Sequence, residues 1–244
     1  MLNQFSRTEL VLGPKAMERL SRARVAVFGI GGVGGNAVEA LVRSGIGQID
    51  IIDNDKFSIT NINRQLFATL SAVGRDKVDV ARERIHDLNP ECVVRAYRSF
   101  YLPETASQFD FRNYDYIVDA VDTVTAKLNL IVEANRANVP IISAMGCGNK
   151  VDPSQLEITD IYRTSVDPLS RIMRQECRKR GIKHLKVVFS KEPPLKPIGS
   201  APEEEKNPGR RDIPGSTAFV PTAAGLLIAS QVVRDLIDFD PSNR

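Results

Sequence analysis

A glycine-rich turn between an apolar run and a helix-like segment limits what this chain can fold into more than any other feature. The sequence GIGGVG occupies residues 29–34, after a buried-strand pattern at 25–28 and before helical apolar spacing at 36–44. Its glycines are Gly29, Gly31, Gly32 and Gly34. The first permits a tight turn, the second lets a phosphate approach backbone N–H groups, and the last lets helix and strand pack closely. The helix start adds unpaired N–H groups and a positive dipole end, so the turn predicts a nucleotide site.

A carboxylate and a polar cluster follow the next predicted strand. Asp53 ends that strand about nineteen residues after the last glycine, where a carboxylate can bind a ribose hydroxyl. The sequence TNINRQ at 60–65 comes next, and Lys77 follows it. Two cations and two amides near the phosphate end suit a triphosphate that is held and cleaved, whereas a hydride-transfer enzyme has little use for them. The candidate nucleotide-binding residues outside the turn are Asp53, Asp55, Asn61, Asn63, Arg64, Gln65 and Lys77.

Strand and helix patterns alternate along the chain. Strands are predicted at 24–29, 48–53, 92–97, 115–119, 139–144, 156–161 and 186–189. Helices are predicted at 14–21, 32–43, 74–88, 125–137, 168–180 and 221–237. The alternation predicts an α/β, Rossmann-like, doubly wound fold, with a mainly parallel sheet, helices on both faces and a C-terminal extension. Such sheets bind ligands outside the carboxyl ends of their strands, where the glycine turn and Asp53 fall.

The length of 244 residues suits one large α/β domain with a long insertion. We expect a single domain over 1–244, made of three parts. These are a nucleotide-binding core at about 22–150, a basic helix and flexible loop at about 163–215, and a C-terminal helix at 221–237. The stretch 193–214 is rich in Pro, Gly and charge, which predicts a loop. The sequence leaves open whether that loop is an active-site flap or a plain surface excursion.

Five segments together resemble one known family. They are GIGGVG, IIDND at 51–55, TNINRQ at 60–65, Lys77 and DAVD at 119–122. With them the chain resembles the adenylating domain of the ubiquitin-activating-enzyme-like superfamily, whose bacterial members activate a carboxylate as an acyl-adenylate. The opening Phe5-Ser6-Arg7 resembles the superfamily's N-terminal arginine, which reaches the ATP site of the neighbouring subunit. The sequences KVVFSKEPP at 186–194 and GSTAFVP at 215–221 resemble the branch of tRNA threonylcarbamoyladenosine dehydratases. The resemblance runs from Phe5 to about Leu236.

The resemblance implies an enzyme that uses ATP and Mg²⁺ and acts on tRNA. The implied catalytic residues are Arg64, Lys77, Asp122 and Arg7, the last from the partner in a homodimer. Asp122 is also the implied Mg²⁺ ligand and contacts the nucleotide through the metal, since this ion favours hard oxygen donors. The implied reaction adenylates the carboxylate of N6-threonylcarbamoyladenosine, after which its ureido group closes a ring and AMP leaves. The sequence leaves open whether the product ring is an oxazolone or a hydantoin.

A basic stretch lies between residues 163 and 191. Its cationic side chains are Arg163, Arg171, Arg174, Arg178, Lys179, Arg180, Lys183, His184, Lys186 and Lys191. The acidic residues interleaved with them are Asp167 and Glu176. A run of charge is often just a solvated face. A basic helix beside an ATP site also suits tRNA phosphates, and the resemblance to a tRNA-modifying branch favours that interpretation.

Two other functions stay open. One is an adenylating enzyme for the C-terminal carboxylate of a small sulfur-carrier protein, although such members often have CxxC pairs for zinc and this chain has none. The other is a nucleotide-binding scaffold that holds a sulfur-transfer partner protein without chemistry of its own. The cysteines Cys92, Cys147 and Cys177 show no pairing pattern, so we expect a reducing compartment, the cytoplasm. The cations around Cys177 would lower the pKa of its thiol.

Nothing in the sequence predicts a membrane span or a signal peptide. The apolar run at 223–233 is too short to cross a bilayer and ends in Arg234 and Asp235. Residues 1–7 are polar and lack the apolar segment of a signal peptide.

Overall fold

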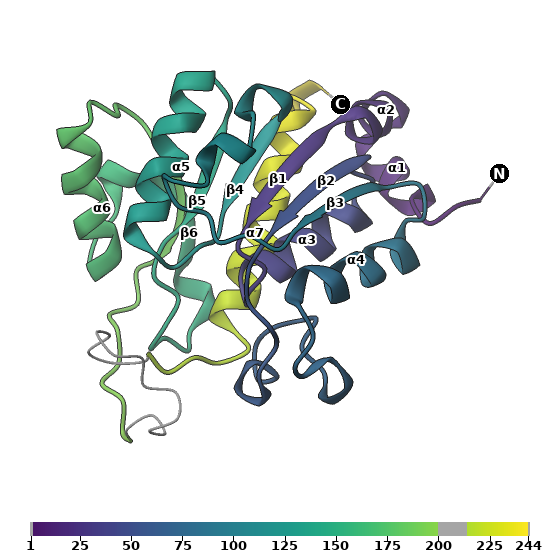
Figure 1. Cartoon of the computed structure of the whole chain (residues 1–244). Coiled ribbons are helices and arrows are strands. Elements are labelled where there is room, and N and C mark those ends of the chain that lie inside the picture. Colours follow the sequence, from purple (N-terminus) through teal and green to yellow (C-terminus); the bar gives the residue numbers. More distant parts are fainter. Residues whose placement is uncertain (1, 200–213, 244) are drawn as a thin grey trace.

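A seven-stranded sheet forms the centre of the computed structural model, which describes residues 2–199 and 214–243 (Figure 1). The strands are β1 (Arg24–Phe28), β2 (Gln48–Ile52), β3 (Val93–Tyr97), β4 (Tyr116–Asp119), β5 (Ile141–Ala144), β6 (Leu156–Asp160) and β7 (Lys186–Ser190). Their order in the sheet is β3-β2-β1-β4-β5-β7-β6. Neighbouring strands run parallel except β6, which pairs antiparallel with β7 at the edge. The order reverses between β1 and β4, which is the switch point of a doubly wound sheet.

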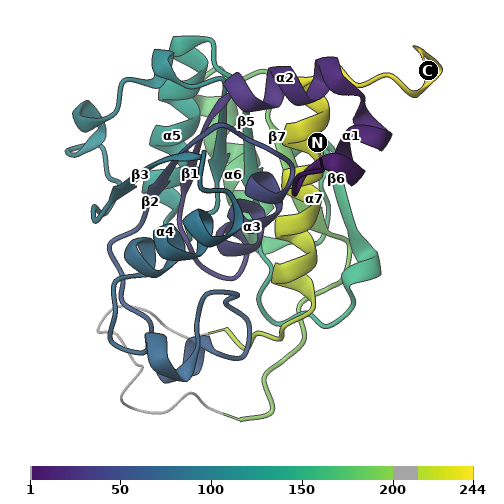
Figure 2. The ribbon, with the colours of Figure 1, turned by 90° about the vertical axis from the view of Figure 1, so that its right-hand side faces the viewer.

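Helices cover both faces of this sheet (Figures 1 and 2). They are α1 (Ser6–Leu12), α2 (Pro14–Arg22), α3 (Gly34–Arg43), α4 (Lys77–Leu88), α5 (Val124–Ala137), α6 (Pro168–Lys179) and α7 (Val220–Leu236). Helix α3 packs against α4 and α7 on one face, and α5 packs against α6 on the other. Helix α2 leads directly into β1, so α1 and α2 lie at the amino-terminal edge of the sheet.

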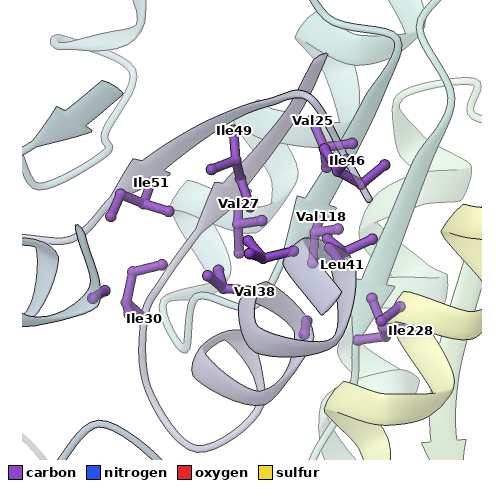
Figure 3. Packing of buried hydrophobic residues seen from close by; sticks show 14 of the residues in the cluster. Val25, Val27, Ile30, Val38, Leu41, Ile46, Ile49, Ile51, Val118 and Ile228 are labelled. Atoms are coloured by element: carbon purple, nitrogen blue, oxygen red, sulfur yellow. The ribbon is translucent and has the colours of Figure 1, made fainter. Parts of the chain in front are cut away.

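Strand β1 is buried on both faces, which explains the continuous apolar run in its sequence. Val25 and Val27 point to the side covered by α3 and α7 (Figure 3), whereas Ala26 and Phe28 point to the opposite side. All four side chains are completely buried. Successive strand residues alternate between faces, so a strand with helices or loops on both sides has no polar face.

Aromatic side chains cover the part of the sheet that α5 and α6 leave open. The ring of Phe28 meets that of Tyr101 at 4.9 Å and that of Phe109 at 5.4 Å, both edge-on. These partners come from the segment between β3 and β4. Edge-to-face pairs of this kind add about 0.5–1.5 kcal/mol each beyond the area they bury. The segment after β3 is therefore fixed against the sheet.

The predicted fold class is confirmed, and all seven predicted strands occur within two residues of their predicted ends. Two helices start later than predicted. Helix α3 begins at Gly34 instead of residue 32, and α4 begins at Lys77 instead of residue 74. Before α4, Gly74 has a φ of +85° and Asp76 pairs with Lys56 in an isolated β-bridge, so the chain cannot yet be helical. Helix α1 is absent from the prediction because it buries none of its residues.

Of the helices in residues 2–199 and 214–243, none has both the length and the apolar character that a membrane span requires. Residues 200–213 of the predicted loop at 193–214 lie outside the described residues.

Candidate nucleotide-binding site

A cavity of about 610 Å³ opens at the carboxyl ends of β1, β2, β3 and β4. Ten of the residues predicted from the sequence line it: Gly29, Gly31, Gly32, Asp53, Asp55, Asn61, Arg64, Gln65, Lys77 and Asp122. They come from separate segments of the chain. Parallel strands bring their carboxyl ends to one edge, and a switch point leaves a crevice there. The fold therefore gathers almost the whole predicted set into one cavity.

The glycine turn forms one wall of the cavity. Gly29 has a φ of +88°, and a Cβ there would lie 2.6 Å from the carbonyl oxygen of Ala120, so only glycine fits. A Cβ on Gly34 would overlap the carbonyl of Gly29, which explains the close packing of helix and strand. In the described part of the chain, the backbone N–H groups of Gly31, Gly32 and Val33 donate to no other group. Three adjacent donors at a helix start can bind an anion such as a phosphate.

Asp53 holds the turn in place as well as facing the cavity. One carboxylate oxygen accepts the backbone N–H of Ile30 at 2.7 Å, and the other accepts that of Asp55 at 2.8 Å. Burial raises the pKa of the Asp53 carboxyl, and the Lys77 ammonium and the two backbone donors offset part of the rise. Each oxygen keeps a second lone pair, so the carboxylate can still accept a ribose hydroxyl.

Lys77 is the buried cation of the cavity. Its side chain is 6% exposed, and Nζ lies 2.8 Å from Asp55 Oδ2. The backbone N–H of Lys77 also donates to the carbonyl of Asp55 at 3.0 Å. These contacts fix the first turn of α4 against the loop after β2. A lysine in this position is a localised positive charge that can bind an anion.

The loop at 60–65 places a guanidinium and two amides at the cavity. Arg64 Nη1 donates to the carbonyl of Thr60 and to Asn63 Oδ1, both at 2.9 Å, which fixes the guanidinium. Asn61 Oδ1 accepts the N–H of Ser58 in a capping box, which leaves its NH₂ group for the cavity. Gln65 is buried, and its Oε1 has no hydrogen-bond partner among the described residues. An unsatisfied buried acceptor in a cavity wall suits a donor on a ligand.

A buried ionic cluster supports the turn that carries Asp122. Asp119 Oδ2 lies 3.0 Å from Lys127 Nζ and also accepts the hydroxyl of Ser143, while its Oδ1 accepts the N–H of Val121 at 3.2 Å. The side chains of Asp119 and Lys127 are at most 1% exposed. Asp119 therefore ties the residues before Asp122 to α5 and β5.

Mg²⁺ can be tested against the donors that the cavity offers. Of the carboxylates at the cavity, Asp53 accepts two backbone N–H groups, Asp55 pairs with Lys77, and Asp122 Oδ1 accepts the hydroxyl of Thr123 at 3.3 Å. Among the described residues, no group of three or more His, Cys, Asp and Glu side chains is arranged around a metal position. Nucleotide-bound Mg²⁺ needs only one or two carboxylates, because phosphates and water complete its shell. A single ligand at Asp122 fits that coordination.

Three predicted residues lie outside the cavity wall. Gly34 acts through packing, and Asn63 donates to the carbonyl of Ser216 at 2.9 Å, linking the loop to the segment before α7. Arg7 is on α1, where Phe5 packs beside Gly45 just ahead of β2. That position is at the amino-terminal edge of the sheet, opposite the cavity. Arg7 therefore does not reach the cavity of its own chain.

Several lining residues were not predicted: Asn54, Lys56, Ser58, Ser99, Phe100, Tyr101, Thr123 and Pro221. The segment 99–101 follows β3, which lies next to β2 in the sheet order. In the sequence, only its position after a predicted strand could have indicated this segment. The same kind of position indicated Asp53.

Burial makes the cysteine thiols poor nucleophiles. It raises the pKa of the Cys177 thiol to about 11, because the side chain is completely buried against the core. The expectation of a lowered pKa is therefore wrong, because burial outweighs the lowering by the nearby Arg180. Burial also raises the pKa values of Cys92 and Cys147 to about 11.

The fold and the site define a class: a Rossmann-like domain whose cavity combines a glycine turn, a ribose-type carboxylate and two cations for phosphates. The chain belongs to the ThiF family, whose model matches residues 5–244. It is 46% identical over 245 aligned positions to the tRNA threonylcarbamoyladenosine dehydratase of Bacillus subtilis (strain 168), covering 97% of this chain and 96% of that protein.

Two solved structures agree with this assignment. The E. coli tRNA N6-threonylcarbamoyladenosine dehydratase in complex with ATP is 32% identical, with a TM-score of 0.86, and the match covers 96% of this chain and 94% of that one. The same protein in complex with AMP is 33% identical, with a TM-score of 0.87 and the same coverage. The resemblance expected from the sequence is confirmed.

Proposed function

We propose that this chain is an ATP-dependent tRNA threonylcarbamoyladenosine dehydratase, which cyclises N6-threonylcarbamoyladenosine through a carboxyl-adenylate. The observation that carries the proposal is the match to the B. subtilis dehydratase over nearly the full length of both proteins. The cavity supports the ATP-dependent half, because a hydride-transfer site has no need of a buried lysine and a fixed guanidinium on the phosphate side.

The chemistry takes two steps. The carboxylate of the threonylcarbamoyl group attacks the α-phosphorus of ATP, the bond to the bridging oxygen breaks, and pyrophosphate leaves. The ureido group then attacks the acyl carbon, the ring closes, and AMP leaves with one former carboxylate oxygen while a proton is released. The net change in the nucleoside is the loss of one water.

The first step uses the glycine turn, Asp53, Arg64, Lys77 and Asp122. The donors of the glycine turn bind phosphate oxygens, and Asp53 orients the ribose. Arg64 and Lys77 stabilise the charge that develops on the phosphates as pyrophosphate departs. Mg²⁺ on Asp122, when bound, neutralises part of the same charge.

The second step requires no nucleophile from the enzyme. The attacking group and the acyl carbon belong to one substrate, and effective molarity in such a reaction supplies about 7–11 kcal/mol of the barrier. The high pKa of the Cys177 thiol is consistent with this route.

Arg7 contributes to catalysis only from a second copy of the chain, so the proposal includes a homodimer. Helix α1 buries none of its residues, and Leu10 on that helix is 86% exposed. An apolar side chain so exposed on an N-terminal helix is suited to contact with a partner.

The same proposal treats residues 1–244 as one adenylating domain and places the chain in the cytoplasm, with ATP and tRNA. The three cysteines are all free, which suits a reducing compartment.

The test incubates the purified protein with Mg²⁺, ATP and tRNA that carries threonylcarbamoyladenosine, followed by digestion and mass spectrometry of the nucleosides. We expect a nucleoside lighter by one water, with AMP and pyrophosphate formed in equal amounts. Asp122→Ala should lose this activity, whereas Asp87→Ala, on the exposed side of α4, should keep it. An unchanged nucleoside, with AMP formed only when a small sulfur-carrier protein is added, would support the sulfur-carrier alternative instead.

A further inference from the structure

The cations of the basic stretch at 163–191 divide into two groups by their partners. One group is committed to contacts within the chain. Arg174 Nη1 donates to the carbonyl of Thr164 at 3.0 Å. Lys179 and Arg180 both pair with Glu176, at 2.6 and 2.5 Å. Lys186 pairs with Asp235 at 2.5 Å, Lys191 pairs with Glu157, and His184 Nδ1 lies 3.6 Å from Asp160.

The other group has no acidic partner among the described residues. Arg163, Arg171 and Lys183 are exposed, and their side chains form no hydrogen bond or ion pair there. Arg178 is exposed too, and its guanidinium lies 5.2 Å from the centre of the Tyr162 ring. We call these four residues, Arg163, Arg171, Arg178 and Lys183, the basic surface.

The four side chains gather in one place. Arg171, Arg174 and Arg178 follow helical spacing along one side of α6, and Arg174 and Arg178 both contact the segment 162–164. The hydroxyl of Tyr162 donates to the carbonyl of Ile182, which places Lys183 beside the same segment. Glu176 and Arg180 occupy the opposite side of α6. Helix α6 therefore places no carboxylate of its own in the basic surface.

Helix α6, which carries Arg171 and Arg178, lies one helix away from the cavity. Helix α6 packs beside α5, and α5 begins two residues after Asp122 at the cavity (Figure 1). Adjacent helices lie about 8–10 Å apart, and twelve residues of α6 extend about 18 Å. A polyanion bound along α6 can therefore extend to the cavity edge.

We infer that the basic surface binds the phosphate backbone of the tRNA. This inference rests on the proposed function, which makes tRNA the substrate. Uncommitted arginines and a lysine around a tyrosine, on the side of α6 away from Glu176, are complementary to phosphates. The neighbouring acid Asp160 accepts the backbone N–H groups of Tyr162 and Leu185 and lies beside His184. The committed cations Lys179 and Arg180 carry the same charge, but both are held by Glu176, which offsets one of their two charges.

The test compares two double variants of equal net charge. Arg171→Gln/Lys183→Gln removes two cations of the basic surface, and Lys179→Gln/Arg180→Gln removes two committed ones. Binding to tRNA is measured between 50 and 200 mM salt, together with ATP affinity. For single-stranded contacts each lost phosphate contact lowers the salt slope by about 0.7, so the first variant loses about 1.4 from the slope. Between 50 and 200 mM salt, the factor by which its tRNA affinity falls should therefore be about sevenfold smaller than the factor for the wild type.

Kinetics give an independent readout. The first variant should raise KM for tRNA and keep kcat at saturating tRNA, with unchanged ATP affinity, because the basic surface does not line the cavity. An unchanged slope and KM in this variant would overturn the inference, and so would equal losses in both variants. Failure of the wild type to convert tRNA would instead count against the proposed function.

Discussion

Replacing Lys127 by methionine is expected to destabilise the protein and to loosen the turn that carries Asp122. Lys127 Nζ lies 3.0 Å from Asp119 Oδ2 and 3.3 Å from Ser143 Oγ. Both charged side chains are buried, so the pair is shielded from solvent. Methionine fills a similar volume but leaves the Asp119 carboxylate buried without its cation.

The size of the effect follows from the burial of the pair. Removing one partner of a buried ion pair costs about 3–5 kcal/mol. In a chain of this length 1 kcal/mol shifts Tm by about 2–4 °C, so Lys127→Met lowers Tm by roughly 6–20 °C. In Lys127→Met/Asp119→Asn no charge is left unpaired, and the amide oxygen can still accept the N–H of Val121. The double variant should recover about 2 kcal/mol of the loss.

The assay combines thermal unfolding with ATP binding by calorimetry at a temperature where all variants are folded. Lys150→Met is the matched control, because Lys150 is also completely buried and pairs with Asp167, but lies outside the cavity. Both single variants should lose stability, whereas only Lys127→Met should weaken ATP binding. A Tm within about 2 °C of wild type for Lys127→Met would refute the reasoning, since exposed ion pairs contribute that little. Equal ATP affinities in all variants would show that other contacts hold the turn.

Three further predictions concern Lys77, the pair Arg7 and Asp122, and Asp235. Lys77→Met should lower kcat for adenylation about 10²–10³-fold, measured as AMP release, because one charge aimed at the phosphates is lost. Arg7→Ala and Asp122→Ala should each be inactive. If equal amounts of the two variants are dissociated and mixed, about a quarter of wild-type activity should return, because half of the dimers are mixed and each of these contains one intact site. No recovery would contradict action in trans. Burial raises the pKa of Asp235, but three hydrogen-bond donors outweigh it and hold the pKa below the usual value. The Asp235 carboxylate therefore stabilises the fold above the usual Asp pKa, and this stabilisation is lost as pH falls through the pKa of Asp235 in the folded protein. Between pH 7 and pH 3 the urea midpoint of Asp235→Asn should thus fall less than that of the wild type.

Much of the fold could be predicted because its strands are buried on both faces. A run such as 25–28 has no polar face, so it stands out against the amphipathic helices around it. Helix α1 lacks this contrast, since none of its residues is fully buried and two of its three apolar residues, Leu10 and Val11, stay exposed. The start of α4 was also mispredicted, because pairing of Asp76 with Lys56 depends on a contact about twenty residues away.

The candidate site was predictable where a motif determines the backbone, as at Gly29 and Gly34. Its supporting contacts were not. Asp119 lies in the DAVD motif, but its partner Lys127 becomes evident only when α5 packs over β4. Phe100 reaches the cavity only because β3 lies beside β2, an order that no local pattern encodes.

Strand register explains why motifs so far apart in sequence meet in one cavity. Phe28 pairs with Ile52 on one side and with Asp119 on the other, Ile52 pairs with Tyr97, and Asp119 pairs with Ser143. These residues form one row across the sheet. The cavity lining starts in that row at Ile52 and one or two positions beyond it in the other strands, at Gly29, Ser99 and Ala120. A slip of one residue in any strand would turn its apolar side chains to the wrong face, so the core fixes the row. The positions of Asp53 and of the turn that carries Asp122 are therefore set by packing in the core, and the motifs supply the chemistry at positions that the core has already determined.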